Sequence, residues 1–226
     1  MSRTAWLITI DGPAGSGKTT LGHWLADVLG VVYLETGWLY RAATYHAIVD
    51  QTGEATWGAS LVANVDVEPR FPAPQCLGQV VRLDGRPLDI ERDLFSSEVE
   101  ALVGQVASNR GLRTAICELA RSVVERHGSA IASGRDAGTV IFPEAKFKIV
   151  LTADPSVRRA RVEQREARNR PGAEKGSDPS TANRLALETA VTEELAARER
   201  SLNLDTTAMS VVSVREAALE YLGVQL

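Results

Sequence analysis

The feature that most constrains the fold is a short apolar run that leads directly into a glycine-rich turn. Residues 5–10 read AWLITI, and residues 12–19 read GPAGSGKT, which fits the pattern G-x-x-x-x-G-K-[ST] without a mismatch. Apolar residues at helical spacing follow at 18–29, and a second apolar run, VVYL, occupies 31–34. Two buried strands joined by a helix form a βαβ unit, so the chain is predicted to build an α/β fold on a parallel sheet.

The glycine-rich turn predicts a site for a phosphate chain. Glycines allow the backbone to curl so that successive N–H groups face anionic oxygens, and the following helix adds its positive end. The predicted ATP contacts form one consecutive phosphate loop: Gly12, Pro13, Ala14, Gly15, Ser16, Gly17, Lys18, Thr19 and Thr20. Within it, Lys18 is expected to reach the β- and γ-phosphates, and the Thr19 hydroxyl is expected to ligate Mg²⁺. The turn therefore predicts the donor, ATP with Mg²⁺, and leaves the acceptor open.

Length and charge exclude several other classes of protein. The chain has 226 residues and a net charge of −4, which favours one core with a small insertion and argues against a nucleic-acid polymer as partner. Its two cysteines provide neither a disulfide framework nor a metal-ligand spacing. No apolar run is long enough for a signal sequence or a membrane span. We therefore expect a cytoplasmic protein that does not bind membranes.

The rest of the chain predicts a small antiparallel sheet and further helices and strands. Residues 65–90 contain short, turn-punctuated strands with a hairpin turn at Asp84-Gly85, and helical periodicity spans about 96–126. The other predicted elements are strands at 129–133 and 147–153, a basic helix at 155–168, a polar linker at 170–184, a helix at about 184–200, and a final strand or turn before a closing amphipathic helix.

Two further motifs follow predicted strands, at the strand ends where α/β sheets place their ligands. They read ETGWLYR at 35–41 and SGRDAGTVIFP at 133–143. With the phosphate loop, in this order and at similar spacing, they resemble bacterial cytidylate (CMP) kinase, whose pattern is IDGPxGxGK(G/S)T, DSGxxYR, an antiparallel insertion and DGRDxGTxxFP. The resemblance covers residues 7–165. It implies the fold of a P-loop nucleoside monophosphate kinase, with a parallel sheet core flanked by helices, a small antiparallel insertion and a helical lid.

The resemblance also implies a division of the chain and a reaction. The core would comprise residues 1–35, 106–155 and 201–226, the acceptor-binding insertion residues 36–105, and the lid residues 156–200. The implied reaction is ATP-dependent phosphoryl transfer to a pyrimidine nucleoside monophosphate, CMP or dCMP. Such a transfer depends mainly on charge neutralisation and positioning. A monomer is expected.

The residues of this reaction are carried over from the family pattern position by position. Catalytic roles are implied for Lys18, Arg135, Arg158 and Arg161. Acceptor contacts are implied for Thr36, Tyr40, Arg41, Gly104, Arg113, Arg135, Asp136 and Arg198. Arg41 and Arg135 would clamp the acceptor phosphate, because guanidinium groups bind phosphate through paired hydrogen bonds.

Three further roles follow from the same resemblance. Asp136 would accept hydrogen bonds from the cytosine amino edge, and Arg113 would reach the pyrimidine. One or more of Arg158, Arg161 and Arg165 would lean over the transferring phosphates or the adenine once the lid closes and excludes water, and Arg158 and Arg161 match the family positions best.

The chain departs from the family pattern at several positions. Glu35 and Thr36 replace the usual Asp-Ser pair, and Ser133 stands where the family commonly has an aspartate. Gly104 aligns with a serine that contacts the base. The segment 198–205 is shortened, so that the aspartate that grips the ribose hydroxyls is missing.

These departures leave three hypotheses about function. The first is a kinase that makes CDP or dCDP from CMP or dCMP. The second is a kinase of the same family whose acceptor is a modified pyrimidine nucleotide or another small molecule, motivated by Gly104 and the shortened 198–205 segment. The third is a nucleotide-binding regulator that transfers no phosphate; the intact Lys18, Arg41 and Asp136 argue against it.

Overall fold

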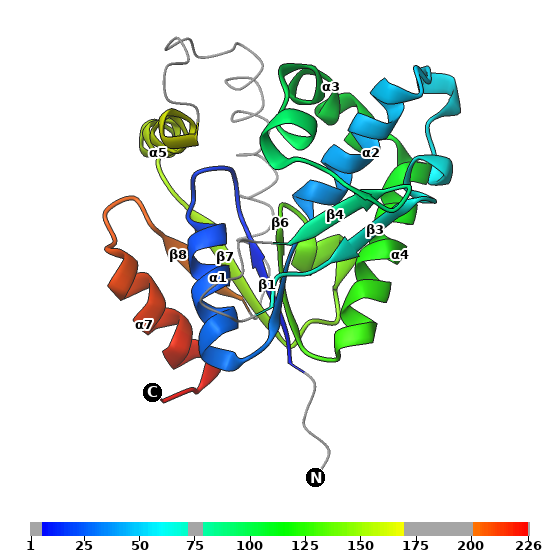
Figure 1. Cartoon of the computed structure of the whole chain (residues 1–226). Coiled ribbons are helices and arrows are strands. Elements are labelled where there is room, and N and C mark those ends of the chain that lie inside the picture. Colours follow the sequence, from blue (N-terminus) through cyan, green and yellow to red (C-terminus); the bar gives the residue numbers. More distant parts are fainter. Residues whose placement is uncertain (1–5, 72–78, 170–200, 226) are drawn as a thin grey trace.

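A five-stranded parallel sheet runs through the centre of the molecule (Figure 1). The computed structural model describes residues 6–71, 79–169 and 201–225. The strands lie in the order β2-β6-β1-β7-β8, and every neighbouring pair is parallel. Their bounds are β1 Leu7–Asp11, β2 Val32–Glu35, β6 Ala130–Gly134, β7 Phe147–Thr152 and β8 Leu202–Asp205. The predicted α/β class is confirmed.

Helices cover both faces of this sheet (Figure 1). On one face, α1 (Lys18–Leu29) and α7 (Val211–Leu222) share a buried apolar cluster with the strands. On the other, α2 (Gly37–Val49) and α4 (Arg110–His127) belong to a second cluster. Successive residues of a strand point to opposite faces, so that Ile131 joins the first cluster while its neighbours in β6 join the second. The two cores hold the carboxyl ends of the strands rigidly at one edge.

The segment between β2 and β6 carries the predicted antiparallel insertion. Strands β3 (Val65–Glu68), β4 (Val80–Leu83) and β5 (Arg86–Pro87) form a three-stranded sheet. Asp84 and Gly85 have φ values of 51° and 74°, which is the geometry of the predicted hairpin turn.

The helical run predicted at 96–126 is two helices, α3 (Ser97–Ser108) and α4. Asn109 separates them, because its backbone is extended and its side chain accepts a hydrogen bond from the Leu112 N–H as the cap of α4. This break lets α3 turn away from α4, so that the two helices contribute different residues to the site.

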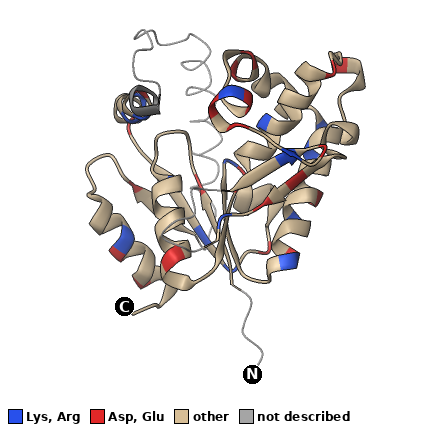
Figure 2. Cartoon of the chain, viewed as in Figure 1, with Lys and Arg blue, Asp and Glu red and all other residues tan. Residues whose placement is uncertain are grey.

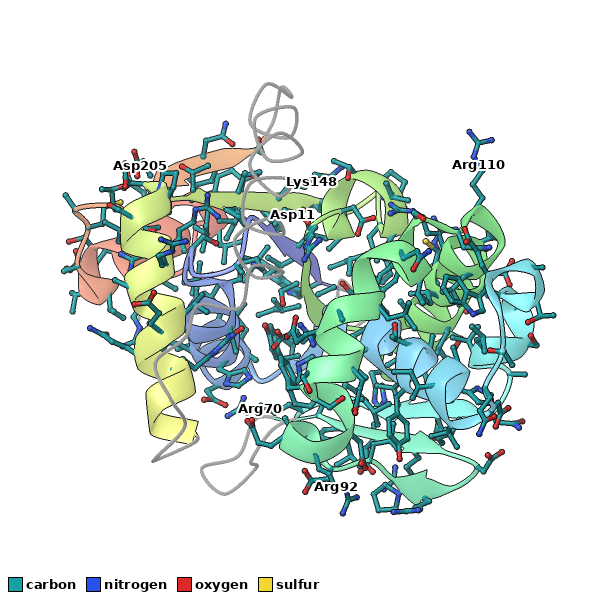
Figure 3. The ribbon with its side chains drawn as sticks, turned by 90° about the horizontal axis from the view of Figure 1, so that it is seen from above. Asp11, Arg70, Arg92, Arg110, Lys148 and Asp205 are labelled. Carbon is teal, nitrogen blue, oxygen red and sulfur yellow. The ribbon has the colours of Figure 1, made fainter. Side chains whose placement is uncertain are left out.

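The basic helix α5 (Pro155–Asn169) lies across the loop end of the sheet from α3 (Figure 3). The predicted linker at 170–184, the predicted helix at 184–200 and Arg198 lie outside the described residues. Of the helices described, none combines the length and the apolar character needed to span a bilayer.

Candidate active site

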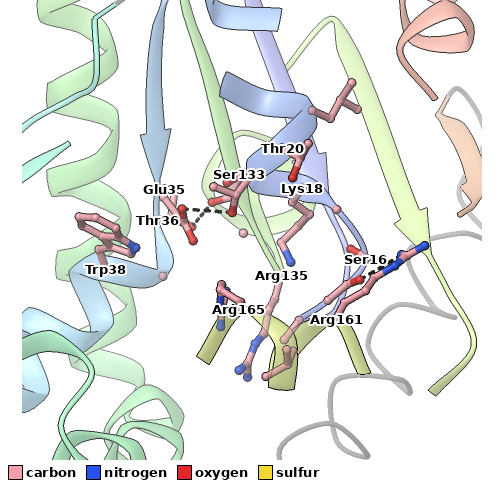
Figure 4. A pocket seen from close by; sticks show the side chains of 18 of the residues that line it. Ser16, Lys18, Thr20, Glu35, Thr36, Trp38, Ser133, Arg135, Arg161 and Arg165 are labelled. Carbon is pink, nitrogen blue, oxygen red and sulfur yellow. Dashed lines mark hydrogen bonds between the residues drawn. The ribbon is translucent and has the colours of Figure 1, made fainter. Parts of the chain in front are cut away.

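One cavity of about 930 Å³ lies at the carboxyl ends of β1, β2 and β6. Its lining comes from the phosphate loop, from the segments after β2 and β6, and from the described parts of α3, α4, α5 and α7. Figure 4 shows that Lys18, Arg135 and Arg165 reach into it from three of these elements. The cavity joins the predicted donor and acceptor sides in a single space.

The phosphate loop is wedged between β7 and α5. Gly12 and Gly15 have φ values of 149° and 79°, and a Cβ on Gly12 would overlap the carbonyl oxygen of Leu151. A Cβ on Gly15 would lie 2.6 Å from the carbonyl oxygen of Arg158. Glycine is required at both positions on conformational and steric grounds. The loop backbone is therefore held in a curled form before any ligand binds.

Replacing Gly15 with alanine should lower the free energy of unfolding by about 1–3 kcal/mol, because the new residue combines a positive φ with a backbone overlap. The same change should weaken ATP binding. The matched control is Gly53→Ala, since Gly53 has a φ of −85° and no described atom within 4 Å of its Cβ position. Denaturant melts and ATP titrations measure both effects; equal stability of the two variants would contradict the steric argument.

Lys18 and Thr19 begin α1 and face the cavity. The Lys18 Nζ donates to the carbonyl oxygen of Pro13 at 2.9 Å, which folds the side chain back along the loop. The Thr19 hydroxyl donates to Glu35 Oε2 at 3.3 Å. Burial raises the pKa of the Glu35 carboxyl, and the nearby Lys18 charge partly opposes this shift. A hydroxyl and a carboxylate thus meet beside the phosphate loop.

This donor set fits Mg²⁺. Magnesium prefers oxygen ligands and is usually held by one or two carboxylates together with substrate phosphates and water. Among the described residues that line the cavity, Glu35 and Asp136 have the carboxylates, and only Glu35 contacts Thr19. The described residues contain no group of three or more His, Cys, Asp or Glu side chains placed to hold a metal ion alone. Glu35 was not among the predicted site residues. The sequence signal for it was its place at the carboxyl end of the second predicted strand, where α/β sheets bind their ligands.

The acceptor side contains a close ion pair between Arg113 of α4 and Asp136, which follows β6. Arg113 also donates to the carbonyl oxygen of Ala107 at 3.5 Å. Tyr40 lies nearby, and burial first and the Asp136 charge second raise the pKa of its phenol. The Tyr40 hydroxyl is buried and has no hydrogen-bond partner among the described residues. This group of side chains offers donors and an acceptor to the polar edge of a ligand.

Arg41 is held in place by three contacts before a ligand arrives. Its guanidinium donates to the carbonyl oxygen of Leu94 at 3.0 Å and to Glu100 Oε1 at 2.8 Å, and it lies 4.0 Å from the centroid of the Phe95 ring. Arg135 is exposed and extends into the cavity (Figure 4). Both predicted phosphate clamps therefore line the cavity.

The family model described as cytidylate kinase matches residues 8–223, nearly the whole chain. The chain belongs to the cytidylate kinase family. A cytidylate kinase from Lysinibacillus sphaericus is 32% identical over 226 residues, which cover 94% of each chain.

Other cytidylate kinase relatives differ in length, and structural neighbours agree in fold. A bifunctional pantoate ligase/cytidylate kinase from Synechococcus is 34% identical over 93% of this chain but only 44% of its own length. This chain thus spans less than half of the first bifunctional relatives that it matches. A shikimate kinase structure from Bacteroides thetaiotaomicron aligns over 97% of this chain and 99% of its own, with a TM-score of 0.52 and 14% identity. The fold is that of an α/β P-loop kinase.

The cavity contains most of the site residues that the cytidylate kinase pattern predicts. The predicted residues that line it are Ala14, Gly15, Ser16, Gly17, Lys18, Thr19, Thr20, Thr36, Tyr40, Arg41, Gly104, Arg113, Arg135, Asp136 and Arg161. Gly12 and Pro13 belong to the phosphate loop but are absent from the cavity lining. Thr36 is almost fully buried, and its hydroxyl donates to the carbonyl oxygen of Ser133 at 2.9 Å, which ties the end of β2 to β6.

The arginines of α5 differ from one another in whether they reach the cavity. Basic side chains recur along this helix (Figure 2). Arg158 is 1% exposed, its side chain donates to the carbonyl oxygen of Ala153, and it is absent from the cavity lining. Its backbone lies against Gly15 of the phosphate loop. The structure therefore does not bring Arg158 to the cavity, where its predicted contact with the transferring phosphates would be made.

Of the α5 arginines whose side chains the structure describes, Arg161 and Arg165 line the cavity. Arg161 donates to the carbonyl oxygen of Gly15 at 3.2 Å and to that of Thr206 at 2.7 Å, so it bridges the loop and the segment after β8. Arg165 is exposed and points into the cavity (Figure 4). Arg165 is one of the arginines, with Arg158 and Arg161, that the sequence predicts to lean over the transferring phosphates or the adenine, and Arg165 lines the cavity.

Asp11 links the donor and acceptor segments. It ends β1, and its carboxylate accepts hydrogen bonds from the N–H groups of Ala137 at 2.7 Å and Gly138 at 2.8 Å. Burial raises the pKa of Asp11 to about 6 despite these two backbone bonds. A side chain on Gly138 would overlap Thr9, so only glycine permits this approach. Asp11 thereby fixes the turn after Asp136 relative to the phosphate loop.

Proposed function

We propose that this protein transfers the γ-phosphoryl group of ATP to a pyrimidine nucleoside monophosphate, with CMP and dCMP as acceptors. One observation carries the proposal: a single cavity is bounded by the phosphate loop on one side and by the Arg113–Asp136 pair, Arg41 and Arg135 on the other. Membership of the cytidylate kinase family supports the choice of cytosine nucleotides.

The residues of the cavity are suited to in-line transfer between two phosphates. Lys18, Arg135 and Arg165 place three positive charges around the space between the donor and acceptor sides (Figure 4). Such charges stabilise the transition state when they are in position beforehand, because no reorganisation is then needed. Thr19 and Glu35 are the residues that would hold Mg²⁺, which would supply positive charge to the β- and γ-phosphates.

On the acceptor side, Arg41 and Arg135 would hold the α-phosphate of the nucleotide. Asp136 would accept from the amino group of the cytosine while Arg113 donates to its ring, which matches the edge pattern of cytosine and opposes that of uracil. An unsatisfied buried partner in such a site costs roughly 10²-fold or more in discrimination.

We further propose the division into core, acceptor insertion at 36–105 and lid at 156–200, in which closure of the lid excludes water from the reaction.

The test is an ADP-release assay with ATP and Mg²⁺ against a panel of CMP, dCMP, UMP and AMP. We expect turnover with CMP and dCMP well above that with UMP and AMP, and its loss when Mg²⁺ is removed by a chelator. Tight ATP binding with no acceptor-dependent turnover would instead support a non-transferring nucleotide-binding regulator.

Arg41→Ala should raise the acceptor KM by about tenfold or more, because a charge-assisted contact with the phosphate is lost. The ATP dissociation constant should stay unchanged, since Arg41 lies on the acceptor side of the cavity. Thermal melting is measured in parallel, because the change also removes the ion pair with Glu100. A variant with normal acceptor kinetics would exclude Arg41 from the phosphate site.

A further inference from the structure

Gly104 occupies the middle of α3, where glycine is unfavourable. A glycine inside a helix costs about 1 kcal/mol relative to alanine. Buried or strained glycines usually have a reason, which is a positive φ or a close approach by another group. Gly104 has neither: it is absent from the residues with positive φ, it is exposed, and no described atom outside its own stretch of helix lies within 4 Å of the position its Cβ would take. Neither the backbone nor the packing of the ligand-free protein requires this glycine.

The space at Gly104 belongs to the acceptor side of the cavity. Gly104 lines the cavity together with Val103 and Ala107 of the same helix. One turn before it, Glu100 holds Arg41, and one turn after it the carbonyl oxygen of Ala107 accepts a hydrogen bond from Arg113. The missing side chain therefore leaves room between the two arginines that the proposed function assigns to the acceptor.

The lining of this cavity includes apolar side chains and one hydroxyl without a described partner. Trp38, Phe95 and Val140 line the cavity along with the α3 residues. The hydroxyl of Tyr40, buried in the same lining, has no hydrogen-bond partner among the described residues. A buried hydroxyl without a partner is costly, and an incoming polar atom would relieve that cost.

The chemistry of the two sides of the acceptor site indicates what fills the space. The Arg113–Asp136 pair suits the polar edge of a pyrimidine, which leaves the ring's carbon edge for the apolar side chains of the lining. We propose that the space at Gly104 receives a small substituent on the pyrimidine ring, of methyl to hydroxymethyl size. The enzyme would then use base-substituted cytidine monophosphates at least as well as the unsubstituted nucleotide. This inference rests on the proposed function and specifies its substrate class.

The test compares dCMP with 5-methyl-dCMP and 5-hydroxymethyl-dCMP in the wild type, Gly104→Ala and Gly104→Ser. The quantity measured is the ratio of kcat/KM for the substituted acceptor to that for dCMP. We expect a wild-type ratio of one or more, and a fall of about tenfold or more in both variants, because one methylene group in a filled pocket changes discrimination by 10–200-fold. Gly53→Ala, outside the cavity, should leave the ratio unchanged. Alanine should not destabilise α3, so a melting temperature at or above wild type separates lost space from misfolding.

Two outcomes would overturn the inference. The first is a wild-type ratio below one for both substituted acceptors, and the second is an equal effect of the Gly104 variants on all three acceptors. Calorimetric titration of the same nucleotides separates this result from failure of the proposed function. Turnover of dCMP alone would overturn the inference and leave the kinase activity intact. Binding of the substituted nucleotides, weakened in both variants and without turnover, would overturn the activity and leave the pocket assignment intact.

Discussion

Replacing Lys18 with alanine will lower kcat by about 10²- to 10³-fold, the usual cost of removing one positioned charge from a transition state. Lys18 faces the cavity from the first turn of α1 and is positioned by the Pro13 carbonyl oxygen 2.9 Å away. Its ammonium group would neutralise charge that builds up on the phosphoryl group during transfer. Stopped assays with saturating ATP and CMP measure kcat directly, and an ATP titration shows whether binding is lost as well.

Lys146→Ala provides the control for this change. Lys146 is an exposed lysine just before β7 and is absent from the cavity lining. Its removal should leave kcat unchanged within error. Near-normal turnover by Lys18→Ala would mean that the phosphate loop does not act on the transferring group.

Asp136→Ala should lower kcat/KM for CMP by about 10²-fold or more while ATP binding stays constant. The carboxylate is paired with Arg113 and is the one acidic group that the described residues present at the acceptor end of the cavity. Its loss removes an acceptor for the cytosine amino group and leaves Arg113 without its partner, and both effects weaken base recognition. Selectivity for CMP over AMP should fall along with the rate.

A double variant shows whether Asp136 and Arg113 act as a unit. If they do, Asp136→Ala with Arg113→Ala should cost little more than either single change. Asp66→Ala serves as control, because Asp66 is exposed on β3 and outside the cavity lining, and the cations that pair with it, on Arg82 and Arg126, are both 3.9 Å away. Fully additive losses, or equal losses for CMP and AMP, would argue against a shared role in reading the base.

Much of the fold could be predicted because it is encoded over short stretches of chain. The strand, loop and helix around the phosphate loop depend on apolar spacing and on glycines whose φ values other residues rarely adopt. The same holds for the hairpin at Asp84-Gly85. The helical run at 96–126 was less well predicted: Asn109 divides it, and a single capping residue inside a continuous periodic pattern is a weak signal.

The positions of individual side chains were harder to predict. One face of α5 carries Arg158, Arg161 and Arg165, so their spacing predicts the same role for all three. Their positions depend on where the phosphate loop meets the helix. Arg158 is buried, Arg161 donates to the carbonyl oxygen of Gly15 in the loop, and Arg165 points into the cavity.

The sequence by itself determined the parallel α/β core, the phosphate loop and the family, because each depends on residues that are close together in the chain. The tertiary structure alone placed Glu35 against Thr19, Glu100 on Arg41, and Asp11 on the turn after Asp136. It also showed that the helix position at Gly104 opens onto the cavity rather than onto packed neighbours. These relationships join elements that are far apart in sequence, and their geometry is set by the packing of helices on the sheet rather than by any local pattern.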